Sequence, residues 1–190
     1  MTTLQRFQGG RSVPEDASAW IRGAMAAFPL EAVVMTMASE IATHDAPVWQ
    51  DRANFIIFAD LSSAGMPGRW EQLWARQLGE AEFELCCIPY FTYSLALGDR
   101  VRTQPSGGRR YVVAEVHARS GRRVVRLWLK EAQARGRECV LRHLESSSPL
   151  HEWSSDNLLA IDVPAGGPDP VLSALLAELP NLGVDVEWAD

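Results

Sequence analysis

The sequence has few of the features that mark secreted or membrane-anchored proteins. Its 190 residues include only three cysteines; Cys86 and Cys87 are adjacent, which disfavours an ordinary disulfide between them, and Cys139 is left alone. No signal-peptide pattern opens the chain, and its most apolar early stretch, 24–38, is interrupted by a proline and a glutamate. We therefore expect a protein of the reducing cytoplasm with no membrane segment.

The chain also lacks the short motifs that accompany common enzyme chemistry. It has no GxSxG, P-loop, GxGxxG or HExxH sequence. Cys139 and His143 have the spacing of one helix face, but a structural zinc site needs four ligands and no second pair has ligand spacing. The pair Gly107–Gly108 is predicted to form a hairpin turn rather than a phosphate cradle. We expect no catalytic set, no cofactor and no metal.

A cysteine-dependent enzyme is nevertheless one alternative. Cys86 and Cys87 lie at the end of a predicted strand. A nucleophilic thiol needs a nearby base or a helix N-terminus to lower its pKa, so His117 or His151 would have to fold beside it. Buried, inert thiols are the simpler interpretation.

The charges are unevenly distributed. Lys130 is the single lysine among eighteen basic residues, a preference for arginine that is typical of GC-rich bacterial genomes. Residues 1–97 carry a net charge of −5, residues 98–142 carry +8, and residues 143–190 carry −9. Such asymmetry has two interpretations: a surface for nucleic acid or a partner, or a basic middle that packs on the acidic end.

The first fifty residues are predicted to form a helical extension. Residues 17–28 and 31–42 have helical patterns, and Pro29 and Pro47 break them. From Asn54 the pattern changes to that of strands, with candidates at 55–58, 70–76 and 82–85. We expect residues 54–121 to form a bent antiparallel sheet or a small barrel.

A hairpin is predicted around Ser120–Gly121, because glycine tolerates the positive φ of a two-residue turn. Its strands would be 111–119 and 122–129. Pairing outward from the turn places Val116 opposite Val125, and it gives the hairpin one wholly apolar face.

The last part of the chain has the pattern of a ferredoxin-like βαββαβ unit, 122–190. A helix is predicted over 131–146, and Asp169 followed by Pro170 predicts the start of a second helix. The predicted helix core residues are Val140, Leu141 and Leu144 in the first helix, and Leu172, Leu175, Leu176 and Leu179 in the second. Strands are predicted near Trp153 and over 158–163 and 184–188. The fold class is therefore α+β, with 54–190 as one compact domain.

Two groups of charged residues are candidate binding surfaces. An acidic group would meet a protein partner through charge complementarity: Glu152, Asp156, Asp162, Asp169, Asp185 and Glu187. An arginine-rich sheet would instead bind single-stranded nucleic acid: Arg100, Arg102, Arg110, Arg122 and Arg126.

Several short segments resemble one bacterial family. They are Arg69 to Ala75 (RWEQLWA), Ile88 to Phe91 (IPYF), Leu97 to Val101 (LGDRV) and Ser120 to Arg126 (SGRRVVR). In this order they resemble the domain-of-unknown-function family 4265, over about residues 54–190. Cys87 occupies a position where that family usually has asparagine. The resemblance implies no established activity.

We therefore expect a non-catalytic cytoplasmic protein-binding protein, and more specifically an immunity protein that neutralises a bacterial toxin. This rests on the acidic end of the chain, the missing catalytic set, and an analogy with other small acidic families. The alternatives are a nucleic-acid-binding module that uses the arginine-rich sheet, and the cysteine-dependent enzyme.

Overall fold

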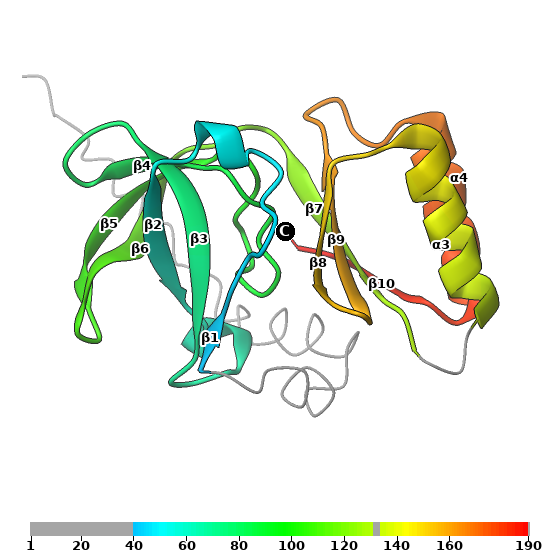
Figure 1. The fold of residues 1–190 in the computed structure, drawn as a ribbon, viewed down its shortest axis with the longest axis horizontal. Helices are drawn as coiled ribbons and strands as arrows, with labels where there is room; N and C mark the ends of the chain where they lie inside the picture. The colour runs from blue at the N-terminus through cyan, green and yellow to red at the C-terminus, as the bar shows by residue number, and fades with distance from the viewer. Residues whose placement is uncertain (1–39, 131–133, 190) are drawn as a thin grey trace, which may run out of the picture.

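The computed structural model describes residues 40–130 and 134–189, and its strands form two sheets (Figure 1). The first contains β1 (Ile41–Ala42), β2 (Phe55–Asp60), β3 (Trp70–Gln77), β4 (Glu82–Leu85), β5 (Arg100–Ser106) and β6 (Arg109–Ala118). The second contains β7 (Arg123–Trp128), β8 (His151–Ser155), β9 (Leu158–Val163) and β10 (Asp185–Trp188). Helices α3 (Ala134–Ser147) and α4 (Pro170–Glu178) cover one face of the second sheet, so the fold is mixed α and β.

The predicted helices 17–28 and 31–42 lie outside the described residues, except at the end of the second one. There the helix prediction is wrong, because Ile41–Ala42 forms β1 and pairs in parallel with Trp70–Glu71 of β3.

The first sheet is strongly bent and closes on itself. Its order is β1-β3-β2-β6-β5-β4, and β4 also pairs with β3, so the pairings from β3 through β2, β6, β5 and β4 return to β3. We call these five strands the barrel. Alternate residues point inward, as the period of a strand requires, and Ile57, Leu73, Phe83 and Val101 are fully buried there.

The predicted hairpin around Ser120–Gly121 is wrong. Strand β6 pairs with β5 and β2, whereas β7 pairs with β9 and β10 in the other sheet. Gly121 does have a positive φ of 77°, but the connection crosses between the sheets. The physical reason is that β7 is buried on both faces, so its apolar residues pack on the helices instead of sharing a face with β6. The hairpin forms between β5 and β6, around Gly107 and Gly108.

The second sheet and its helices follow the predicted order of strand, helix, strand, strand, helix, strand. The strand order is β10-β7-β9-β8, with antiparallel neighbours throughout. Asp169 caps α4 as predicted, accepting hydrogen bonds from the backbone N–H groups of Val171 and Leu172. Leu141 was expected in the core of α3 but is 40% exposed, because it points about 100° around the helix from the buried Val140.

An apolar cluster joins the second sheet to the barrel. Val124, Trp128 and Leu158 of the sheet pack against Leu61 and Ile88 from the barrel side. Strand β9 is consequently buried on both faces.

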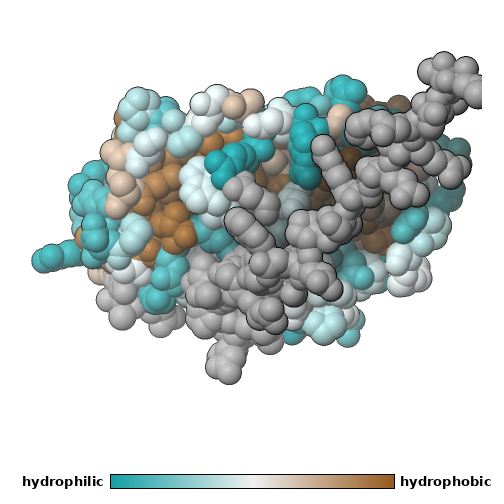
Figure 2. All heavy atoms as spheres, turned by 180° about the vertical axis from the view of Figure 1, so that it is seen from behind, coloured by the Kyte–Doolittle hydropathy of each residue, from teal (hydrophilic) through white to brown (hydrophobic). Residues whose placement is uncertain are grey.

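Seen from behind, apolar surface gathers on the half of the molecule that holds the two helices, and polar residues border it (Figure 2).

Candidate functional site

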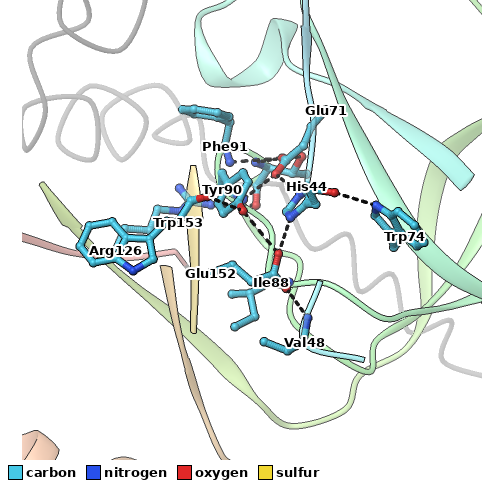
Figure 3. A network of polar contacts seen from close by, with 11 residues as sticks. His44, Val48, Glu71, Trp74, Ile88, Tyr90, Phe91, Arg126, Glu152 and Trp153 are labelled. Atoms are coloured by element: carbon cyan, nitrogen blue, oxygen red, sulfur yellow. Dashed lines mark hydrogen bonds and ion pairs between the residues drawn. The ribbon is translucent and has the colours of Figure 1, made fainter. Parts of the chain in front are cut away.

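A buried polar network lies where the barrel meets the second sheet (Figure 3). Its centre is His44, in the segment that follows β1. The His44 Nδ1 atom is 2.6 Å from Oε2 of Glu152, and its Nε2 atom is 3.2 Å from Oε1 of Glu71. The Tyr90 ring stacks on the imidazole, with the ring centroids 4.0 Å apart and the planes 10° from parallel. The side chains of His44, Glu71 and Glu152 are each at most 1% exposed, so the network is sealed from solvent.

The two carboxylates come from different sheets, and each also binds backbone. Glu71 lies on the inward face of β3 and holds the 88–92 loop in place. It accepts hydrogen bonds from the backbone N–H groups of Tyr90, Phe91 and Thr92 and from the Thr92 hydroxyl. Glu152 lies on β8 and accepts from the N–H groups of Val48 (3.0 Å) and Ile88 (2.9 Å). The network therefore fixes the segments around His44 and Ile88 to both sheets.

The pKa shifts agree with an ion pair at the centre. Burial alone lowers the pKa of His44, but Cys87, Glu152 and Glu71 raise it, and the result is well above the ordinary value. Burial alone raises the pKa of Glu71, but His44, Thr92 and the Tyr90 N–H lower it, and the result is below the ordinary value. An imidazolium beside the Glu71 carboxylate is the state that these shifts favour.

The structure brings one cysteine to a histidine, although not to the predicted one. Cys87 interacts with His44, rather than with His117 or His151. Burial raises the pKa of the Cys87 thiol; His44 lowers it, the nearby carboxylates raise it further, and the net shift is upward. Cys86 is also buried, and burial raises its pKa to about 11. A buried thiol that stays protonated is a poor nucleophile, which weighs against the cysteine-dependent enzyme.

The predicted acidic residues do not form one exposed surface. Asp156 and Asp169 are exposed, but Asp169 caps α4. The others pair with residues of the same chain: Glu152 in the network, Asp162 with Arg122, Asp185 with Lys130, and Glu187 with Arg126 and Tyr93. Burial raises the pKa of Glu187, despite its partners Tyr93 and Arg126.

The predicted arginine-rich sheet is divided between two sheets. Arg100, Arg102 and Arg110 are exposed on β5 and β6 of the barrel, whereas Arg122 and Arg126 lie at or in β7. Arg122 pairs with Asp162 through two hydrogen bonds, and Arg126 is 2% exposed. Of the two interpretations of the charge pattern, packing of the basic middle on the acidic end is confirmed by the Arg122–Asp162, Arg126–Glu187 and Lys130–Asp185 ion pairs.

Sequence reasoning missed His44 and Glu71. His44 carries no local signal, because it lies in a segment that was predicted to be an extension. Glu71 does carry one: it shares the strand period of Leu73 and Ala75, both fully buried, so a carboxylate stands where an apolar residue is expected.

A family model described as "Domain of unknown function (DUF4265)" matches residues 71–187. The chain belongs to the DUF4265 family. The resemblance read from the sequence segments is thus confirmed, over a range that contains Glu71 and Glu152 but begins after His44. No curated protein matches the chain.

The DUF4265 chain is also similar to a solved structure, a hypothetical protein from Neisseria gonorrhoeae. The TM-score is 0.50 at 18% identity, and the match covers 63% of this chain and 80% of that chain. This likeness concerns the fold alone. Neither α3 nor α4, the helices of the described part, is long and apolar enough to span a bilayer.

Proposed function

We propose that this DUF4265 chain is a non-catalytic binding protein whose partner is another protein, in the way that an immunity protein covers its toxin. One observation carries the proposal. The thiol, imidazole and carboxylates that come together in the described residues are sealed from solvent, and the carboxylates accept hydrogen bonds from the protein's own backbone. They hold two sheets together and present no reactive atom to a substrate.

The arginines of the barrel support a binding role at the surface. Arginine and aromatic side chains are the residues that dominate protein–protein interfaces, and they meet on the barrel: Arg109 stacks on Trp70 at 4.4 Å and Arg110 on Tyr111 at 5.2 Å. The acidic group contributes less to this proposal than its number of residues suggested, because most of its members are paired internally.

The proposal includes a bacterial cytoplasmic location and a ferredoxin-like second half. Cys86, Cys87 and Cys139 are free thiols, which is typical of a reducing compartment. The element order from β7 to β10, together with the antiparallel strand order β10-β7-β9-β8, supports the ferredoxin-like assignment.

Affinity capture from the native cells tests the function. The tagged full chain serves as bait at low and at high salt, beside an unrelated acidic protein of similar size with the same tag. We expect one protein to be retained by the chain alone, in a nearly equimolar amount. Retention of nucleic acid, or of no protein above the control, would contradict a protein-binding function.

A further inference from the structure

A groove at the surface of the barrel combines apolar rings with hydrogen-bonding amides. It has a volume of about 660 Å³ and lies over β2, β3 and β6. Its lining includes the rings of Phe55, Trp74 and Tyr111, the side chain of Ile56, and the amide of Gln72. Apolar walls with a few polar groups are typical of sites that receive one or two side chains of a partner.

The floor of the groove is preorganised. The Phe55 and Tyr111 rings meet edge to face, with centroids 4.8 Å apart. Both rings also contact Phe83, which is fully buried, at 5.0 and 5.6 Å. The indole N–H of Trp74 donates to the backbone carbonyl of His44 at 3.0 Å. Because these rings are already held in place, binding there costs little conformational entropy.

Unneutralised guanidinium groups lie beside the groove. Arg110 stacks on Tyr111 (5.2 Å), and Arg109 stacks on both Phe58 (5.0 Å) and Trp70 (4.4 Å). Within residues 40–130 and 134–189, neither Arg109 nor Arg110 forms an ion pair. Other arginines do: Arg76 of β3 pairs with Glu84, Arg102 of β5 pairs with Glu115, and Arg52, which precedes β2, also pairs with Glu84. Stacking orients a guanidinium and leaves its N–H edge available for a carboxylate.

We propose that this groove, with Arg109 and Arg110, binds an acidic segment of the partner protein that places an apolar side chain against the rings that line it. The inference rests on the proposed function. Carboxylates on either side of that side chain would pair with the two arginines, whose fork geometry matches a carboxylate. The excess positive charge beside the groove, on a protein of net charge −6, gives the complementarity that selects an acidic segment.

The same contacts argue against a nucleic acid as the occupant. Single-stranded nucleic acids bind by stacking bases on aromatic faces. Of the rings that line the groove, Tyr111 already carries the Arg110 guanidinium on one face, and Phe55 is in edge-to-face contact with Tyr111, so fewer free faces remain for stacked bases.

A peptide titration of the full chain, monitored through the backbone amide signals in NMR spectra, tests the site. The probe is the capped peptide Glu-Glu-Phe-Leu-Glu-Glu, compared with the same peptide carrying glutamine for every glutamate and with a six-nucleotide thymidine strand. We expect the acidic peptide alone to shift the amides of Ile56, Gln72 and Tyr111 in a saturable way. Equal binding of the glutamine peptide, tighter binding of the oligonucleotide at these amides, or no saturable shift with millimolar acidic peptide would overturn the proposal.

Two charge reversals provide the matched comparison. Arg110→Glu should weaken the binding of the acidic peptide by about tenfold or more, because it removes a charge-assisted hydrogen bond. Arg142→Glu, on the far helix α3 at a 71% exposed side chain, should leave the affinity unchanged. Unchanged thermal melting will confirm that both variants fold, and equal affinities in the two variants would refute the site.

Capture from cells with the wild-type and Arg110→Glu baits separates this inference from the proposed function. A partner retained by wild type and lost with Arg110→Glu supports both. A partner retained equally by the two baits keeps the function and refutes the groove. If neither bait retains a protein, the proposed function itself fails, and the peptide titration alone decides whether the groove binds acidic segments.

Discussion

Replacing Glu152 by glutamine should be among the most destabilising conservative changes in this protein. The Glu152 side chain is 1% exposed and faces donors only: the His44 ring, the N–H groups of Val48 and Ile88, and the Tyr90 hydroxyl. Glutamine has the same shape, but it has one acceptor oxygen in place of two and adds an N–H₂ group. At least one donor would then face another donor.

The size of the effect follows from the lost charge and the unsatisfied donor. Removing one partner of a buried ion pair costs about 3–5 kcal/mol, although His44 keeps Glu71 as a second partner. We therefore expect a loss of about 3 kcal/mol in the free energy of unfolding. For a chain of 190 residues this lowers Tm by about 6–12 °C.

Urea unfolding followed by tryptophan fluorescence measures this change as a lower midpoint at an unchanged m-value. Asp156→Asn is the control, since it neutralises an exposed carboxylate near Glu152 in the sequence and should change the stability by less than about 0.5 kcal/mol. If the Glu152→Gln midpoint fell within the range of this control, the network would not be a stabilising centre, and the argument that its groups serve structure would fail.

Three further predictions concern other buried groups. Because the folded-state pKa of His44 is raised above 6.5, its contribution to stability is complete below pH 6.5 and is lost as the pH rises through the folded-state pKa. The decline in stability above pH 6.5 should thus be shallower in His44→Gln; an identical pH dependence in the two proteins would contradict the raised pKa. With a thiol reagent at neutral pH, Cys139 should react in the folded protein and Cys87 only after denaturation, so rapid labelling of Cys87 would argue against its burial. Arg126→Met should cost about 3–5 kcal/mol by leaving the Glu187 carboxylate in the core without its ion-pair partner, and adding Glu187→Leu should restore most of it, since Arg126 Nε and Glu187 Oε2 already lack hydrogen bonds. Urea midpoints that were simply additive would refute that coupling.

Local patterns in the sequence were sufficient to locate most elements of the second half. The Asp169–Pro170 pair predicts where α4 begins, because the cap satisfies N–H groups of the first turn within a few residues. The strands β9 and β10 were recognised from short apolar or alternating runs. Each of these features depends on residues that are neighbours in the chain, so the elements in the folded structure lie close to where the sequence predicts them.

Local patterns were not sufficient to predict which strands pair. The alternation in β6 and β7 is compatible with a hairpin, and Gly121 has the positive φ that a hairpin turn would use. Yet β7 pairs with β9 and β10, in a sheet that has the helices on one face and the barrel-side cluster on the other, and this arrangement buries both faces of β7. A local pattern specifies that a strand has an apolar face, but which element covers that face depends on the whole fold.

The buried network shows the same division. The inward position of Glu71 in β3 was readable from the strand period, and it indicated a carboxylate that must find a partner. The partner, His44, is 27 residues away, and the second carboxylate, Glu152, is 108 residues from that histidine. The sequence by itself determined the composition, the strand period and the helix cap; only the tertiary structure decided which charges meet, because burial of an ion pair requires two sheets to close over it.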